Sequence, residues 1–359
     1  MRPTLRNLLF VLLGSFVGCQ EMPTDAPESA DEALFARGGN KPPKDPPTGG
    51  TADPAIAFGY GDILMVMDED GSHRTELIEG VGRGVSWSPN GRSIAYGPGG
   101  LGWSSTIVVA DLALSNGIPV VVDSRDLNVP HPHSPSWSPL GDLIAYAGGC
   151  DPGEPDGTCP PDGFMNHIRA VPASGGTAFT IYETPDCVDP YDCRISSTPA
   201  WHPDGDQIAF VEARDGWTVH ALRLVDVGGA PTQVSQALIE PGDLAMICNP
   251  DWSPDGSRIA FWGRETVNGG ANLFAYDVAD DVWTNLGLTS NHGCEGLSWS
   301  PDGTRWVVNQ DSGIRIVDAD PNSSSYGQVI PRKKSKLAFG YYPAWRPCEA
   351  GSDGCGLAP

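Results

Sequence analysis

The amino-acid sequence predicts an all-β fold, and three observations support this prediction. A ten-residue motif, WSPDGSRIAF at Trp252–Phe261, recurs with variations at Trp87–Tyr96, Trp137–Tyr146, Trp201–Phe210 and Trp299–Val308. A sixth, truncated copy stands at Trp345–Pro347, and successive tryptophans lie 50, 64, 51, 47 and 46 residues apart. Helical periodicity is almost absent from the chain. Four short strands per unit at this period are typical of a β-propeller, in this case with six blades.

Each copy of the motif predicts a β-hairpin. Proline sets φ at the first corner of the turn, and glycine accepts the left-handed conformation that reverses the chain. Two further runs with apolar bias follow in each unit and complete four strands. We expect the third strands over residues 106–111, 167–172, 220–226, 272–277 and 313–318, and the weaker fourth strands over runs such as 119–122 and 179–182.

The two ends of the repeat region complement each other. Residues 55–58 and 62–68 look like the second and third strands of a unit that lacks its tryptophan strand, and residues 344–347 supply such a strand. We therefore expect one propeller over residues 54–347, closed by pairing of its N- and C-terminal strands. This closure leaves no open sheet edge between the first and last blades.

The pattern Trp-Ser-Pro-Asp-Gly-x-x-Ile-Ala-Phe, followed by a strand of the Val-x-Asp kind, resembles the TolB-type β-propeller repeat. The resemblance covers roughly residues 54–347 and implies the propeller fold, but it says much less about function. TolB itself has an additional N-terminal α/β domain, where this chain has only a short segment. Some related propellers precede an α/β-hydrolase peptidase domain, but we find no Gly-x-Ser-x-Gly motif in this chain and expect no such peptidase.

The N-terminus predicts export. Arg2 and Arg6 precede an apolar run over residues 8–17, so residues 1–18 are predicted to be a signal peptide. The run is too short for the alternative, a membrane-spanning helix. It ends in Phe-Val-Gly-Cys19, which resembles the cleavage site of bacterial lipoproteins and implies a lipid on Cys19. Gln20 beside it resembles the outer-membrane sorting pattern of a Gram-negative host.

Residues 19–53 are rich in Pro, Gly, Asp and Glu and predict a disordered tether, and residues 348–359 form a C-terminal tail. We therefore expect a monomeric protein of the cell envelope, held to the membrane by its lipid alone. The net charge of -23 argues against nucleic acid as a partner. The basic residues 332–336 are interpreted as a solvated loop, with a binding patch as the alternative.

Cysteine usage agrees with export, because eight cysteines remain when Cys19 is set aside. Proximity predicts three short disulfide loops: Cys150–Cys159, Cys187–Cys193 and Cys348–Cys355. The remaining Cys248 and Cys294 stand at nearly equivalent positions before Trp252 and Trp299, so we predict a bond between adjacent blades. A zinc site is the alternative, but no Cys-x-x-Cys pair occurs.

The longer connections point to one face of the propeller as the binding face. We expect long loops at residues 123–134, 147–166, 183–198 and 235–249, all opening on the side opposite the short hairpin turns. Residues at the start of the innermost strands should surround the mouth of the central channel. The candidates are Arg83, His133, Ser134, Ser197, Thr198, Asn249, Glu295, Tyr341 and Tyr342. They could hold a peptide, a sugar or an ion, and the alternative is an ordinary water-filled mouth.

Metal and catalytic motifs are weak. His131 and His133 share one face of a strand, but His202 and His292 are expected elsewhere, so a histidine metal site lacks ligands. The Asp68–Gly71 segment is better explained as a turn than as a calcium loop. We therefore predict no cofactor, with calcium or another divalent ion left open.

The predicted function is non-catalytic. We expect a membrane-anchored extracytoplasmic binding or scaffolding module that recognises a cell-envelope protein or a peptide. The alternative is a propeller that binds oligosaccharides or degrades polysaccharides with a metal at the channel mouth. An accessory role in secretion or surface assembly is a third interpretation.

Overall fold

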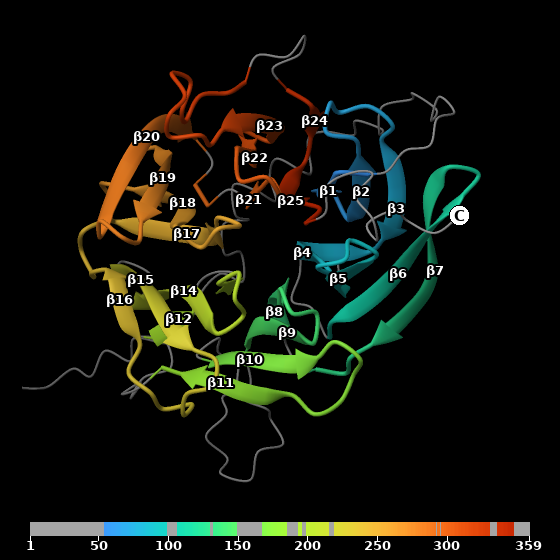
Figure 1. Ribbon diagram of the computed structural model, residues 1–359, viewed down its shortest axis with the longest axis horizontal. Helices are drawn as coiled ribbons and strands as arrows, with labels where there is room; N and C mark the ends of the chain where they lie inside the picture. Colours follow the sequence, from blue (N-terminus) through green and yellow to red (C-terminus); the bar gives the residue numbers. More distant parts are fainter. Residues whose placement is uncertain are drawn as a thin grey trace, which may run out of the picture. The chain divides into compact units, whose positions relative to one another are not determined.

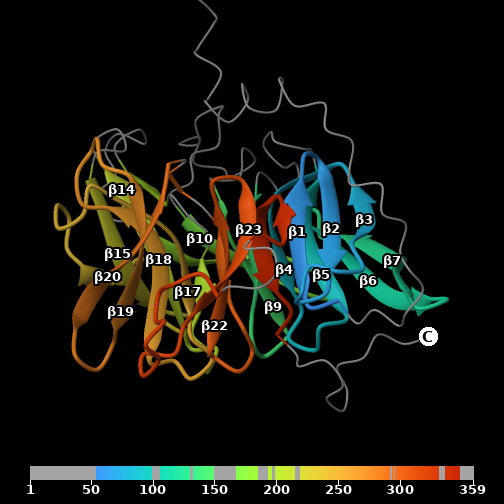
Figure 2. The same ribbon diagram turned by 90° about the horizontal axis from the view of Figure 1, so that it is seen from above.

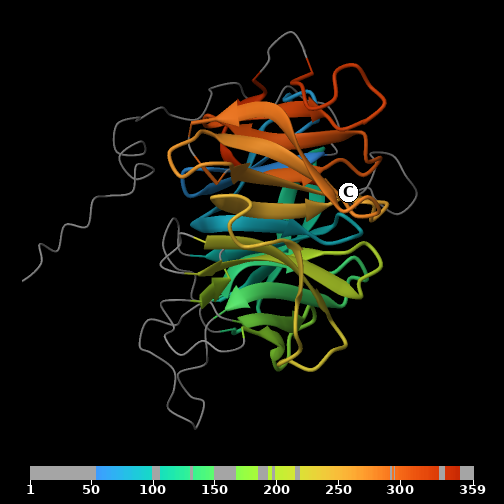
Figure 3. The same cartoon turned by 90° about the vertical axis from the view of Figure 1, so that its left-hand side faces the viewer.

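The computed structural model describes residues 54–98, 106–129, 132–148, 167–184, 193–195, 199–214, 219–291, 293–294, 296–330 and 336–347. These residues form six antiparallel sheets around a central axis, and no helix occurs among them. In Figure 1 the innermost strands surround the centre and the outermost strands lie at the rim, and Figures 2 and 3 show the same sheets from the side. Within this part of the chain, no helix is long and apolar enough to span a membrane. The predicted signal peptide, Cys19, the tether and the C-terminal tail lie outside the described residues.

Each blade is one sheet, in which the strands follow one another from the innermost, at the axis, to the outermost, at the rim. The first blade consists of β25 (Tyr341–Trp345), β1 (Ile56–Tyr60), β2 (Ile63–Met67) and β3 (Thr75–Glu79). The second consists of β4 (Val81–Trp87), β5 (Ser93–Pro98), β6 (Val108–Ser115) and β7 (Ile118–Asp126). The third consists of β8 (Pro132–Trp137), β9 (Leu143–Gly148), β10 (His167–Pro172) and β11 (Phe179–Glu183). In the fourth blade, β12 (Cys193–Ile195) and β13 (Ala200–Trp201) are innermost, followed by β14 (Gln207–Arg214), β15 (Val219–Asp226) and β16 (Gln236–Ile239). The fifth consists of β17 (Met246–Trp252), β18 (Arg258–Arg264), β19 (Ala271–Asp277) and β20 (Val282–Ser290). The sixth consists of β21 (Leu297–Trp299), β22 (Arg305–Gln310), β23 (Gly313–Asp318) and β24 (Ala338–Phe339).

The predicted closure of the ring is confirmed. Strand β25, from the C-terminal end, pairs antiparallel with β1, placing Ile56 opposite Trp345. Arg346 continues the closure, because its backbone N–H donates to the carbonyl of Ala55 at 2.8 Å and its side chain reaches the carbonyl of Gly91 in the next blade at 2.7 Å. The first blade is therefore built from both ends of the described chain.

The repeated motif forms a hairpin turn with its own hydrogen bonds. The Ser253 hydroxyl donates to the Asp255 carboxylate at 2.6 Å and accepts from the backbone N–H of Arg258 at 2.9 Å. Gly256 adopts the left-handed conformation, with φ at 71°. The Ser253 hydroxyl and the backbone N–H of Ser257 lower the pKa of Asp255 to about 2. The serine and aspartate of the motif therefore stabilise the turn that proline and glycine permit.

Hydrophobic packing joins neighbouring blades. On β18, Ile259 and Phe261 are fully buried against the fourth blade, whereas Ala260 and Trp262 face the sixth blade. This alternation arises because successive side chains of a strand point to opposite faces. Both faces of the sheet are covered, as expected for a blade between two others.

Tryptophan adds a polar link between blades that the sequence did not reveal. The indole Nε1–H of Trp87 donates to Ala344 at 3.2 Å, that of Trp201 to Ser136 at 3.0 Å and that of Trp299 to Asp251 at 3.0 Å. In each case the acceptor is the backbone carbonyl of the residue just before the tryptophan of the preceding blade. In these three blades the tryptophan therefore links adjacent blades as well as filling the core, whereas the indole of Trp137 donates within its own turn to Gly141.

Three of the expected long loops contain strands, so those loop predictions were wrong in part. Strand β7 runs to Asp126 because the β6–β7 hairpin extends over Val108–Asp126, turning at Asn116 and Gly117, which both have positive φ. The range 183–198 contains β12, and the range 235–249 contains β16 and the start of β17. Backbone pairing with neighbouring strands, rather than an apolar pattern, produces these elements. Most of the 147–166 loop lies outside the described residues.

Candidate binding channel

A cavity of about 400 Å³ lies along the axis of the propeller. It is lined by β4, β8, β17, β21 and β25, and by β13 of the fourth blade, so all six blades contribute. The residue two positions before each motif tryptophan is among the lining residues: Val85, Pro135, Pro199, Pro250, Leu297 and Pro343. Four of the six are prolines, which lack a backbone N–H and so need no ladder partner. These six positions of the wall are therefore apolar.

A left-handed residue precedes several of these positions. Ser134, Asn249 and Tyr342 have φ values of 50°, 48° and 47°, and Gly84 has 82°. The pairing register of β4, β8, β17 and β25 shifts close to these residues, as in β-bulges. Positive φ is uncommon for a tyrosine and clusters at functional sites. The ladder resumes beyond the bulges, as where Cys248 lies opposite Trp262 and His133 opposite Ala147.

The structure brings some of the predicted mouth residues together. Asn249 of β17 and Tyr342 of β25 line the cavity. Tyr341 of β25 and His133 of β8 belong to innermost strands but are not among the lining residues. The ring of His133 contacts the Ser134 hydroxyl at 3.0 Å through Nδ1. Arg83 lies in β4, but its side chain is outside the described part of the chain, as are Ser197, Thr198, Glu295, His131 and His292.

Sequence reasoning missed Asp251, the only charged side chain among the described lining residues. Its Oδ2 accepts from the backbone N–H of Trp299 at 3.0 Å, and the Ser298 hydroxyl also binds it. Burial raises the pKa of Asp251 to about 7, although hydrogen bonds from Trp299, Trp252 and Ser298 oppose the rise. A comparison of the repeats could have identified Asp251, because the residue just before the motif tryptophan is uncharged in the other five blades: Ser86, Ser136, Ala200, Ser298 and Ala344.

The predicted bond between Cys248 and Cys294 is present, with a Cα–Cα distance of 5.5 Å. It joins the fifth blade to the chain that leads into the sixth. Because Cys248 precedes Asn249, this bond braces the channel mouth at one of its lining residues. The side chains of the other six predicted disulfide cysteines, Cys150, Cys159, Cys187, Cys193, Cys348 and Cys355, lie outside the described residues.

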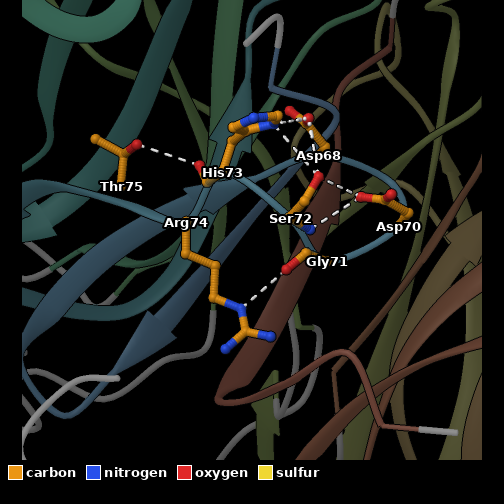
Figure 4. A network of polar contacts seen from close by, with 7 residues as sticks. All are labelled: Asp68, Asp70, Gly71, Ser72, His73, Arg74 and Thr75. Atoms are coloured by element: carbon orange, nitrogen blue, oxygen red, sulfur yellow. Dashed lines mark hydrogen bonds and ion pairs between the residues drawn. The ribbon is translucent and has the colours of Figure 1, made fainter. Parts of the chain in front are cut away.

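The acidic segment Asp68–Gly71 forms the turn between β2 and β3 (Figure 4). Its carboxylates bind protein donors: Asp68 contacts the ring of His73 at 2.5 Å, and Asp70 accepts from the backbone N–H of Ser72 at 2.9 Å. Across the described residues, no group of three or more His, Cys, Asp or Glu side chains is placed to hold a metal. His202, in the hairpin turn of the fourth blade, packs edge-on against Trp252 of the fifth blade, and their ring centroids lie 4.7 Å apart.

Comparisons with known proteins agree on the fold. TolB from Acinetobacter baumannii aligns with 21% identity over 83% of this chain and 68% of that chain, with a TM-score of 0.56. This chain has the fold of a six-bladed β-propeller, similar to the propeller of TolB. A chain of a nidogen/laminin complex aligns with 9% identity over 81% of this chain and 98% of that chain, with a TM-score of 0.55. At such identities the similarity establishes the architecture and not a shared function.

A looser alignment, with a TM-score of 0.48, relates the chain to hydrazine synthase from Kuenenia stuttgartiensis, at 15% identity over 72% of this chain and 71% of that chain. No protein-family model and no curated protein matches this sequence.

Proposed function

We propose that this TolB-like propeller is a non-catalytic binding protein that recognises a segment of another cell-envelope protein in its central channel. The observation that carries the proposal is the cavity lined by all six blades. Proline and tryptophan side chains provide apolar surface there, and Ser136, Asn249 and Tyr342 provide hydrogen-bonding groups. Binding sites of proteins combine these two features, an apolar wall with a few placed polar groups.

The scaffold suits such a role. The channel walls belong to strands that are paired within each blade and packed between blades, so little order has to be gained on binding. The nidogen/laminin structure, whose fold is similar, is a complex of proteins, which supports a protein as the class of partner. We further infer that a signal peptide over residues 1–18, a lipid on Cys19 and a tether over residues 19–53 hold the propeller at the outer membrane.

The test is a crosslinking capture experiment with the full-length tagged protein in its own envelope. Ser136→Phe fills the channel, because Ser136 lines it and its hydroxyl makes no hydrogen bond to a described residue. The matched control is Val122→Phe on β7, where Val122 is 61% exposed at the rim. Both variants should keep the melting temperature of the wild type within a few degrees.

We expect one envelope protein to be captured by the wild type and by Val122→Phe but not by Ser136→Phe. Equal capture by all three proteins would move the binding site away from the channel. If no protein is captured and an oligosaccharide binds the wild type but not Ser136→Phe, a glycan replaces the protein as the ligand.

A further inference from the structure

We propose that the segment bound in the channel presents a cationic group, a lysine ammonium or an arginine guanidinium, to Asp251. This inference rests on the proposed function and specifies the chemistry of the partner. The remaining polar groups of the described lining, Ser86, Ser136, Ser298, Asn249 and Tyr342, are neutral hydrogen-bonding groups. Within the described part of the lining, a ligand therefore meets one carboxylate among apolar and neutral groups.

The carboxylate has room for a ligand donor. A carboxylate offers about four lone-pair sites, and the protein donors at Asp251 are two backbone N–H groups and the Ser298 hydroxyl. Asp251 is partly exposed and is one of the residues that line the cavity. A cation reaching this surface would form a charge-assisted hydrogen bond, which is shorter and stronger than a neutral one.

The walls favour an organic cation over a bare ion. Trp137 and Trp201, although largely buried between blades, are among the residues that line the same cavity as Asp251. Indole faces attract ammonium and guanidinium groups, and the methylene stem of lysine or arginine can lie along proline and indole surface. The protein already uses this contact elsewhere, since Arg346 lies over the ring of Trp87 at 5.6 Å and Arg258 over that of Trp299 at 5.2 Å.

Charge on the whole chain acts in the same direction. The net charge of -23 attracts a basic segment before contact and accelerates its association. The long-range field thus favours the same sign of ligand as the carboxylate in the channel. Only Asp251 can supply the short-range selection among the described lining residues.

The proposal predicts a pH dependence with a defined sign. Burial raises the pKa of Asp251 to about 7, so the empty channel is only partly charged at neutral pH. A cationic ligand binds the ionised form, and its affinity should therefore rise between pH 6 and pH 8. Besides Asp251, Tyr342 is the only titratable side chain among the described lining residues.

The test compares eight-residue peptides that differ at one central position, which is lysine, arginine, norleucine or glutamate. Binding to the full-length protein is measured by calorimetry at pH 6 and pH 8. We expect the lysine or arginine peptide to bind wild type at least about tenfold more tightly than the norleucine peptide at pH 8. Asp251→Asn and Asp251→Ser should remove this preference, and serine already occupies the equivalent position in three other blades.

The outcomes separate this inference from the proposed function. No preference for the basic peptides on wild type, or an unchanged preference in both Asp251 variants, would overturn it. If the envelope partner is still captured by Asp251→Asn as well as by wild type and is lost only in Ser136→Phe, the channel binds a protein but not through a cation.

Discussion

Replacing Asp251 by asparagine should stabilise the empty propeller at neutral and alkaline pH. Asparagine has nearly the same shape and can accept the N–H of Trp299, which lies 3.0 Å from Oδ2 of Asp251. It removes the charge, which the channel accommodates poorly, and replaces one carboxylate oxygen with an amide NH2 group, toward which the Ser298 hydroxyl can turn as acceptor. In the folded protein burial raises the pKa of Asp251 from 3.8 to about 7. The folded state therefore holds a proton that the unfolded chain releases between these two pH values.

The sign and size of the effect follow from this proton. Because the unfolded state binds fewer protons between pH 4 and pH 7, the free energy of unfolding of the wild type falls as pH rises through this range. A tenfold change in a dissociation constant corresponds to about 1.36 kcal/mol, so the full rise would correspond to roughly 4 kcal/mol. Water in the open channel screens part of the charge, and we expect a change of about 2 to 4 kcal/mol.

The assay is urea unfolding of wild type and Asp251→Asn at intervals from pH 3.5 to pH 8.5. The difference in the free energy of unfolding between the two proteins should shift in favour of the variant as pH rises from 4 to 7 and should be constant above pH 8. A difference independent of pH would refute the reasoning, because it would place the pKa of Asp251 at its ordinary value. The comparison cancels the contributions of all other titrating groups that the two proteins share.

Three further predictions concern the links between blades. Trp299→Phe should lower the free energy of unfolding by about 1 to 2 kcal/mol more than Trp252→Phe. The Trp299 indole donates across the blade interface, whereas the buried Nε1 of Trp252 has no hydrogen-bond partner among the described residues. Equal losses in urea unfolding would exclude a contribution from the Trp299 bond. The double variant Cys248→Ser/Cys294→Ser should lose about 4 kcal/mol, since the bond closes a separation of 46 residues, and an unchanged melting temperature would contradict this. Arg346→Leu should lose about 3 kcal/mol in the same assay, because Arg346 is 1% exposed and holds the carbonyl of Gly91; retention of wild-type stability would show that strand pairing alone closes the ring.

The propeller scaffold could be predicted from the sequence because interactions between residues close in sequence determine each hairpin. The Ser253-Pro-Asp-Gly256 turn stabilises itself through bonds within six residues, so each copy specifies its hairpin independently. The closing blade was predictable because the two incomplete copies at the chain ends complement each other. The Cys248–Cys294 bond followed from their equivalent positions in adjacent repeats.

The channel was less predictable because its features depend on residues far apart in sequence. The indole of Trp299 donates to the backbone carbonyl of Asp251, and no side-chain pattern marks a carbonyl as an acceptor. The raised pKa of Asp251 likewise arises from burial by several blades. Asn249 and Tyr342 were expected at the mouth, but their positive φ was not, since a left-handed tyrosine has no clear sequence signal.

The position at which one blade departs from the repeat indicates the binding chemistry better than the repeated residues do. The position before the motif tryptophan is filled by serine or alanine in the other five blades, so the fold does not require a carboxylate there. At that position Asp251 retains a charge that destabilises the empty channel. Natural sequences keep such unfavourable groups mainly where function needs them. A stability gain in Asp251→Asn, combined with loss of preference for a basic peptide, would show that this carboxylate serves the ligand and not the fold.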